Sequence, residues 1–269
     1  MRPVVLSVAG LDPGGGAGLV QDVRTIDAHG CWPAAVATAL TVQTVGEVRA
    51  VHPVPARCLA DQIQAVFDDL PVAAVKLGLM PGRETVLAVD SALSATDVPI
   101  VLDPVCGSTS GARLIDGDAL DALRRTLLPR ATVVTPNLVE ARQLAGVAGA
   151  GADRCAEILR GMEVPQVLIT GGGANGESCV DRLFSADGTH ILEHLSIETN
   201  RDHGTGCVHS SSVAAHLAHG RTVLDAASAA GLWMEHVLTH AVGFGGGGAP
   251  DTAHAGLAFA RRPRARDQS

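Results

Sequence analysis

The chain has 269 residues, 46% of them hydrophobic, and a formal net charge of -8 at pH 7. This length and composition can bury a substantial core, as one large α/β domain or two small ones. The negative charge argues against non-specific binding to nucleic acid or to an anionic membrane, because both need a basic surface. Aromatic residues make up only 2% and tyrosine is absent, which argues against stacking platforms for single-stranded nucleic acid. We expect a small-molecule partner.

The cysteines and the N-terminus indicate where the protein works. The six cysteines are scattered without any Cys-x-x-Cys pair, which argues against a zinc site or a disulfide framework. The apolar run at the N-terminus turns into glycine after about ten residues, too short for a signal peptide or a membrane span. We therefore expect a cytoplasmic protein with reduced thiols.

Apolar runs bounded by turn residues recur along the chain, at 4–10, 34–42, 72–79, 99–105, 131–137 and 166–173. Continuous apolar strands, rather than alternating ones, are what a parallel sheet covered on both faces requires. Apolar residues three and four apart predict helices between them, at 56–70, 83–95, 117–129, 137–147 and 152–162. The alternation predicts an α/β fold with a doubly wound sheet and right-handed crossovers.

The segment 179–199 has a different pattern. Ala186-Asp187-Gly188 separates two short strands there, which predicts a hairpin added antiparallel at the edge of the sheet. No repeat or linker splits the chain, so we expect one domain over 1–258 and a polar, flexible tail over 259–269. The glycine-rich segment 243–250 looks too loose to pack tightly.

Polar residues gather where the predicted strands end, which is where open parallel sheets bind ligands. A glycine-rich turn after the first strand carries Asp12, and Asp22 follows in the next helix. The turn lacks the Gly-Lys-Ser/Thr of a P-loop and is not a clean G-x-G-x-x-G. A tight turn and a backbone cradle for a ligand therefore remain equally open.

Two later strands end in acidic residues. Asp103 follows the fourth strand and suits Mg²⁺, which takes one or two carboxylates together with substrate phosphates, although it could instead cap the next turn. Asn137 and Glu140 follow the fifth strand with the spacing of a capping box, which is the favoured interpretation of this pair alone. Two acid-bearing strand ends in one sheet favour a metal and phosphate site.

The stretch 200–220 places a Gly-Thr-Gly turn before a helix of small residues. The backbone amides of Gly204, Thr205 and Gly206 can converge on one point at the positive end of the helix dipole, which predicts an anion hole. Cys207 lies in the first turn, where the dipole would lower the pKa of its thiol and make it a proton acceptor. The alternative is a small buried packing residue.

Taken together, the motifs resemble a known family. VAGLDPGGGAGLVQDVRT, TALTVQT, KLGLM, VLDPV, TPNLVEA and HGTGC stand in the order and spacing of the hydroxymethylpyrimidine and phosphomethylpyrimidine kinases of thiamine biosynthesis, within the ribokinase-like superfamily. The resemblance covers 3–250. It implies a Rossmann-like, mostly parallel sheet without a separate lid domain, the use of ATP and Mg²⁺, and a homodimer. Most ribokinase-like enzymes have an aspartate base at the position of Cys207, whereas Gly-Thr-Gly-Cys marks the pyrimidine kinases and some related vitamin kinases.

Carried over by position, the resemblance implies a pyrimidine site. Asp22 and Gln43 would hydrogen-bond the aminopyrimidine, and Gly10, Met80 and Val105 would line its pocket. Gln43 suits this task because its amide offers both donors and acceptors to a ring with an amino group and ring nitrogens.

The resemblance also implies a metal and nucleotide site. Asp103 and Glu140 would act on Mg²⁺, directly or through water, and Asn137 would face the nucleotide phosphates. The amides from Gly204 to Cys207 would receive the transferring phosphoryl group. Positioning and electrostatic stabilisation supply most of phosphoryl-transfer catalysis.

The chain departs from the family pattern at two positions. Thr170 and Thr109 stand where the family usually has lysines, at the nucleotide end of the site, and Lys76 is the only lysine in the sequence. Arg113 or Arg201 could replace the missing cation, although arginine needs a different geometry. This departure bears on the second phosphorylation more than on the fold or the first reaction.

Two other functions compete with the pyrimidine kinase. A pyridoxine or pyridoxal kinase would act on a hydroxymethyl group of another six-membered nitrogen ring. A catalytically weak, pyrimidine-binding sensor would explain the missing lysines. Turnover of ATP with a panel of pyrimidine and pyridine alcohols separates the three.

Overall fold

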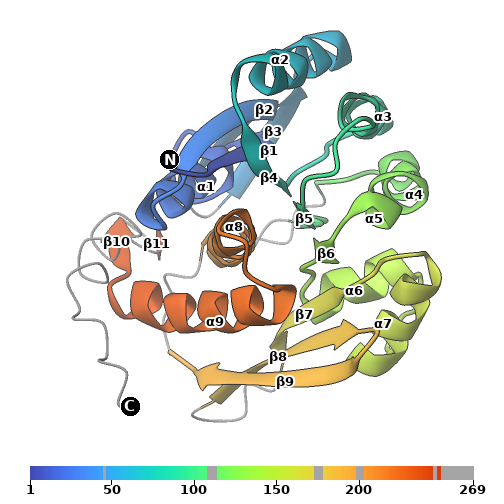
Figure 1. Ribbon diagram of the computed structural model, residues 1–269, viewed down its shortest axis with the longest axis vertical. Coiled ribbons are helices and arrows are strands. Elements are labelled where there is room, and N and C mark those ends of the chain that lie inside the picture. The colour runs from blue at the N-terminus through green and yellow to red at the C-terminus, as the bar shows by residue number, and fades with distance from the viewer. Residues whose placement is uncertain (45–46, 108–113, 173–177, 198–202, 245–246, 250–269) are drawn as a thin grey trace.

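The computed structural model describes residues 1–44, 47–107, 114–172, 178–197, 203–244 and 247–249. Within them lie the strands β1 (Val4–Leu11), β2 (Trp32–Thr44), β3 (Glu47–Pro53), β4 (Val72–Leu77), β5 (Ile100–Leu102), β6 (Val133–Val134), β7 (Val167–Gly172), β8 (Ser178–Ser185) and β9 (Gly188–Leu195). These described strands form one nine-stranded sheet in the order β3-β2-β1-β4-β5-β6-β7-β8-β9 (Figure 1).

The centre of the sheet is parallel and both edges are antiparallel. The strands β2, β1, β4, β5, β6 and β7 pair in parallel in this order, as the continuous apolar runs predicted. The predicted hairpin is confirmed: β8 and β9 pair antiparallel at one edge of the sheet. A second antiparallel strand, β3, lies at the other edge. The sequence analysis missed β3 because its residues are mostly half-exposed or exposed and form no continuous apolar run.

Helices cover both faces of the sheet. They are α1 (Gly18–Ala28), α2 (Ala56–Asp69), α3 (Arg83–Ala92), α4 (Gly117–Arg125), α5 (Leu127–Arg130), α6 (Leu138–Ala145), α7 (Ala152–Gly161), α8 (Thr205–Ala218) and α9 (Val223–Thr239). Helices α1, α8 and α9 lie on one side, and α2 to α7 lie on the other (Figure 1). The fold is therefore α/β, with helices on both faces of a mostly parallel sheet, as predicted.

The two faces divide the core between them. In β1, Val4, Leu6 and Val8 pack into the cluster under α2 to α7, while Val5 packs toward α8 and α9. Burying one such side chain contributes about 1.5–3 kcal/mol. A strand covered on both faces gains this at every position, which is why these runs do not alternate with polar residues.

The chain reverses its direction of winding between β1 and β4. From β1 it continues outward to β2 and β3, then crosses back to β4 on the other side of β1. Loops leaving the carboxyl ends of β1 and β4 therefore run to opposite sides and leave a crevice between them, the usual ligand site of such sheets.

The glycine-rich segment near the C-terminus corrects one expectation. Instead of a loose stretch, β10 (Val242–Phe244) and β11 (Gly247–Ala249) form a two-stranded antiparallel ribbon. Backbone hydrogen bonds can hold such a ribbon without large side chains. The predicted tail, 259–269, lies outside the described residues. No helix in the described part of the chain is long and apolar enough to cross a membrane.

Candidate active site

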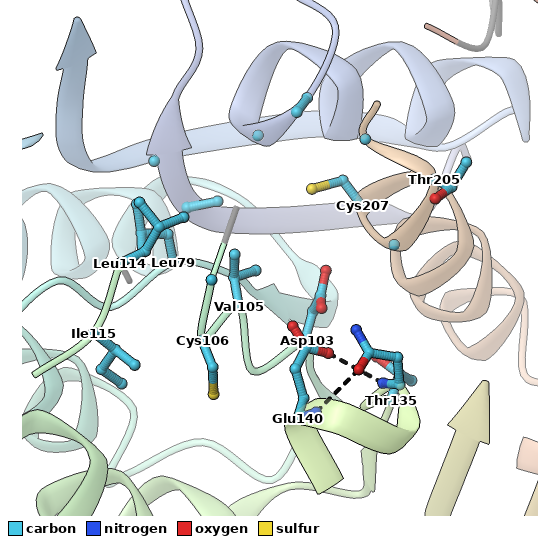
Figure 2. A pocket seen from close by; sticks show the side chains of 18 of the residues that line it. Leu79, Asp103, Val105, Cys106, Leu114, Ile115, Thr135, Glu140, Thr205 and Cys207 are labelled. Atoms are coloured by element: carbon cyan, nitrogen blue, oxygen red, sulfur yellow. Dashed lines mark hydrogen bonds between the residues drawn. The ribbon is translucent and has the colours of Figure 1, made fainter. Parts of the chain in front are cut away.

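A cavity of about 1060 Å³ opens at the carboxyl ends of the parallel strands. Its walls come from the loops after β1, β4, β5 and β6, the end of β7, the outer part of β2, and the start of α8 (Figure 2). Pockets for one drug-sized ligand usually measure about 300–1,000 Å³. This cavity is therefore large enough for a nucleotide beside a small aromatic ring.

The glycine-rich turn after β1 is held by the side chain of Asp12. One carboxylate oxygen accepts a hydrogen bond from the amide of Gly14 at 2.8 Å, and the other accepts one from Ala17 at 2.9 Å. Gly18 has φ +55°, and a Cβ there would lie 2.3 Å from the carbonyl oxygen of Gly10. Since Gly10, Ala17 and Gly18 also line the cavity, the segment is both a tight turn and a wall of the site.

The start of α8 packs directly against that turn. Its N-cap, Gly204, has φ +84°, and a Cβ there would lie 2.1 Å from the carbonyl oxygen of Gly16. Only glycine permits this approach. The first amides of a helix have no intrahelical acceptor, and Thr205, Gly206 and Cys207 line the cavity. The geometry therefore suits the predicted anion hole, whose ligand stays a prediction.

The expectation for the thiol of Cys207 is wrong. Burial raises its pKa to about 12; the Lys76 ammonium opposes this effect, while Asp22 and Asp103 add to it. The low dielectric and the two carboxylates outweigh the helix dipole. Cys207 faces the cavity as a neutral thiol at neutral pH (Figure 2).

A buried ion pair lies behind the cavity wall. The Nζ of Lys76 is 3.0 Å from both carboxylate oxygens of Asp22, and neither side chain is exposed. The hydroxyls of Ser7 and Ser211 also donate to Asp22, at 2.7 and 2.9 Å. Burial alone would lower the pKa of Lys76, but Asp22 and Asp103 raise it above its ordinary value, so the side chain is an ammonium ion.

The network corrects the predicted role of Asp22. Its carboxylate is occupied by Lys76 and two serines, and it is absent from the residues that line the cavity, whereas Lys76 is among them. Met80 is corrected in the same way: it is only 1% exposed and packs in the core, and its neighbour Leu79 lines the cavity instead.

Asp103 connects this network to the cavity. The hydroxyl of Ser210 donates to its Oδ2 at 2.9 Å, and the Nζ of Lys76 lies 3.6 Å from the same oxygen. Burial raises the pKa of Asp103, and the charge of Asp22 adds to this, against Lys76 and Ser210. Two carboxylates thus share one ammonium, which leaves negative charge for a cation in the cavity.

Glu140 combines the two interpretations left open by the sequence. Its carboxylate accepts from the amide of Asn137 at 3.1 Å, and Asn137 Oδ1 accepts from the amide of Glu140 at 3.0 Å, so the capping box of α6 is confirmed. Glu140 also lines the cavity near Asp103 (Figure 2). Burial and the charge of Asp103 raise its pKa to about 8. The donor set fits Mg²⁺, which prefers carboxylate oxygens.

The remaining predicted positions divide into two groups. Gly10, Gln43, Val105, Asn137 and Thr170 line the cavity. Thr109, Arg113 and Arg201 lie outside the described residues, so the cation that replaces the family lysines stays a prediction.

The sequence analysis missed several polar residues of the site. The imidazole Nε2 of His203 lies 3.2 Å from Asp12. Ser210 and Ser211, expected only as small packing residues, hold Asp103 and Asp22. The one available signal was Lys76, because a single charged residue inside an apolar strand requires a buried partner.

Comparisons with known proteins agree with this geometry. A family model described as phosphomethylpyrimidine kinase matches residues 12–251. A relative from Rhizobium meliloti (strain 1021), named hydroxymethylpyrimidine/phosphomethylpyrimidine kinase, is 42% identical over 245 residues, which are 90% of this chain and 92% of the relative.

Two solved structures carry the same fold. The ADP complex of Bacillus subtilis pyridoxal kinase has a TM-score of 0.86 and 28% identity, over 96% of this chain and 100% of that one. Phosphomethylpyrimidine kinase from Clostridium difficile 630 has a TM-score of 0.76 and 31% identity, over 87% of this chain and 98% of that one.

Proposed function

The chain belongs to the phosphomethylpyrimidine kinase family and is a kinase, and on this premise we propose that it phosphorylates the hydroxymethyl group of 4-amino-5-hydroxymethyl-2-methylpyrimidine with ATP, in thiamine biosynthesis. The monophosphate formed is the proposed substrate of a second phosphorylation. The observation that supports this most is one cavity in which the amide end of α8 lies near Asp103 and Glu140. Anion-binding amides beside carboxylates that can hold a cation are the parts phosphoryl transfer requires.

Asp103 and Glu140 are the residues that would hold Mg²⁺. When bound, the ion neutralises charge on the phosphate oxygens. Replacing either acid with its amide, as Asp103→Asn or Glu140→Gln, should raise the Mg²⁺ concentration needed for half-maximal activity. The control is Glu157→Gln, which changes an exposed acid on α7. Unchanged Mg²⁺ dependence with lowered thermal stability would leave Glu140 with its capping role alone.

The chain's own groups would orient the acceptor. Gln43 can pair with the polar edge of the pyrimidine, and the amides of Thr205, Gly206 and Cys207 can hold the transferred phosphoryl group. Because the pKa of Cys207 is raised to about 12, we assign its thiol to positioning the hydroxyl. The loose transition state of phosphoryl transfer has little bond formation to the nucleophile, so the hydroxyl proton can leave late.

A pyridine alcohol is the second candidate substrate, since the structure is so similar to that of Bacillus subtilis pyridoxal kinase. The test is ATP consumption by the purified chain with the pyrimidine alcohol, its monophosphate, pyridoxine and pyridoxal. We expect the highest kcat/KM for the pyrimidine alcohol and a phosphorylated product by mass spectrometry. A higher kcat/KM for a pyridine alcohol would favour the second candidate, and pyrimidine binding without turnover would favour a sensor.

We also propose a cytoplasmic homodimer built on one domain, 1–258. Leu40 and Val42 are about half exposed on the same face of β2, so this face suits contact with a second copy. Light scattering after gel filtration should give twice the chain mass, and Leu40→Asp should shift it toward the monomer. A monomeric wild-type chain would refute the dimer.

A further inference from the structure

Three side chains with metal-binding atoms lie on one face of the β8–β9 hairpin, away from the residues that line the cavity. Cys179 and Asp181 are two residues apart on β8, so they point to the same side of the strand. His194 stands directly opposite Cys179 on β9, and cross-strand partners share a face. One ligand atom from each residue lies within 4.8 Å of the other two.

A fourth side chain reaches this group from helix α8. His209 is only 6% exposed, and its Nε2 lies 3.3 Å from Oδ2 of Asp181. That geometry is not a hydrogen bond, and neither ring nitrogen of His209 has a hydrogen-bond partner among the described residues. The Nε2 atom therefore has only its ion-pair contact with Asp181, and the buried Nδ1 atom has no hydrogen-bond partner among the described residues, which indicates a missing water or ion.

The spacing of Cys179, Asp181 and His194 fits a shared ion, whereas His209 lies outside the group of ligand atoms that are all within 4.8 Å of one another and would have to move toward the ion to bind it. Two ligand atoms that are each about 2.0–2.1 Å from a tetrahedral metal ion lie about 3.3–3.4 Å apart. The Nε2 atoms of His194 and His209 both lie 3.3 Å from the same oxygen of Asp181. Without an ion, His194 pairs directly with this oxygen through a hydrogen bond at 3.3 Å, which the metal would replace.

We propose that Cys179, Asp181 and His194 bind one Zn²⁺ ion and that His209 moves in as the fourth ligand, which completes a closed, four-coordinate structural site. Thiolate sulfur, imidazole nitrogen and carboxylate oxygen are the ligands this ion takes in proteins. One thiolate and one carboxylate balance its two positive charges, so the occupied site is neutral and can be buried. The absence of a Cys-x-x-Cys pair did not reveal this set, because the ligands meet across a hairpin and a helix.

The surroundings are built to hold these ligands. The other oxygen of Asp181 accepts a hydrogen bond from the amide of Gly171 at 2.9 Å, which orients the carboxylate as an outer partner does in metal sites. Gly231 of α9 leaves room for the imidazole of His194, since a Cβ there would lie 3.0 Å from the ring. Gly171 also lines the cavity, and His209 follows Cys207 by two residues. The ion would thus tie the edge hairpin to both the cavity wall and helix α8.

The test uses the untagged, full-length chain, stripped with a chelator and then titrated with Zn²⁺. Elemental analysis after gel filtration should give one Zn²⁺ per chain, and Co²⁺ should give the absorption of a tetrahedral site with a thiolate ligand. Cys179→Ser and His194→Gln should each weaken Zn²⁺ binding by about 100-fold or more, since even outer-shell changes cost 10–100-fold. His209→Gln should weaken it by about 10-fold or more.

Matched controls are Cys58→Ser and His52→Gln, which change an exposed cysteine and an exposed histidine. Both should bind Zn²⁺ as the wild type does. Zn²⁺ should raise the Tm of the wild type and controls, but not of Cys179→Ser. A wild-type chain without stoichiometric Zn²⁺, or unchanged binding in Cys179→Ser and His194→Gln, would overturn the proposal.

A second measurement needs no variant and so survives a failure of the variants to fold. Alkylation of the wild-type thiols, followed by mass spectrometry, should be slowed by Zn²⁺ at Cys179 but not at Cys58. Equal rates at Cys179 with and without Zn²⁺ would also overturn the proposal.

Discussion

The first two turns of helix α8 contact buried carboxylates in two places, and these carboxylates differ in the partners that surround them. Beneath the cavity, Asp22 and Asp103 share the single ammonium of Lys76. Behind the edge hairpin, Asp181 faces the imidazoles of His194 and His209. In the first group two carboxylates share one ammonium, whereas in the second a single carboxylate lies between two imidazoles, although one helix contacts both.

The pKa values reflect this difference. Burial raises the pKa of Asp103, and Lys76 and Ser210 do not fully offset it. Burial also raises that of Asp181, but His194, the nearby imidazole of His209 and the Gly171 amide lower it below its ordinary range. A buried acid whose pKa stays high has too few positive partners. The shortage of positive charge lies at the cavity, where phosphoryl transfer needs a cation.

Removing the ammonium that Asp22 and Asp103 share should have the largest effect on stability. Lys76→Met leaves two buried carboxylates without their ammonium, which should lower the free energy of unfolding by about 3–5 kcal/mol. Urea denaturation measures this. The double variant Lys76→Met with Asp22→Asn should recover part of the loss. Arg154→Ala, which breaks an exposed pair with Glu157, should cost less than about 1 kcal/mol. A similar small loss for Lys76→Met would show that its charge is not needed.

The pyrimidine side of the cavity should respond more weakly. Gln43→Leu leaves a polar ligand edge unpaired, which costs about 1–3 kcal/mol. The KM for the pyrimidine alcohol should therefore rise, while the KM for ATP changes little. Steady-state kinetics with each substrate varied in turn measures both. Equal changes in the two KM values, or none, would remove Gln43 from the pyrimidine site.

Near the end of α8, His216 contacts His29 at the end of α1, with ring centroids 4.8 Å apart. Burial lowers the pKa of His29 to about 3, and the charges of His216, His219 and Arg221 add to this. The unfolded chain, with an ordinary pKa near 6.5, binds this proton first. The stabilising contribution is therefore complete above pH 6.5 and is lost as the pH falls toward 3.

At pH 5 the loss from His29 should be about 2 kcal/mol relative to pH 8. His29→Gln removes this titration, so its free energy of unfolding should fall less than that of the wild type between pH 8 and pH 5. His52→Gln, at an exposed histidine, should behave as the wild type. The same pH dependence in wild type and His29→Gln would refute a neutral buried His29.

Cys207 should show the smallest effect. If its neutral thiol only positions the hydroxyl, Cys207→Ala loses one hydrogen bond, about 0.5–1.5 kcal/mol or roughly 2- to 12-fold in kcat. At saturating Mg²⁺, which would keep Glu140 ionised, the wild-type kcat should then stay nearly constant from pH 7 to pH 9. A loss of about 10²–10⁴-fold in Cys207→Ala, with a wild-type kcat that rises with pH and partial recovery in Cys207→Asp, would restore the role of general base.

Local pattern was enough for most of the fold and for the location of the site. The apolar runs identified the parallel strands, and the polar residues at their ends marked the wall of the cavity. It was not enough for side-chain direction. Successive residues beyond β4 point to different sides, so Leu79 lines the cavity while Met80 enters the core. A sequence motif shows that this segment reaches the site, but not which of two adjacent residues faces the cavity.

The sequence by itself determined the central parallel strands and the helices between them, where glycine is required and which polar residues end each strand, because these depend on neighbours a few residues apart. Only the tertiary structure decided the state of the charges. Lys76 reaches Asp22 across 54 positions of the chain, and Ser210 reaches Asp103 across 107. The thiol of Cys207 has a raised pKa because these distant carboxylates and the surrounding protein outweigh the dipole of its own helix. Burial and charge pairing come from residues far apart in sequence, so no local pattern contains them.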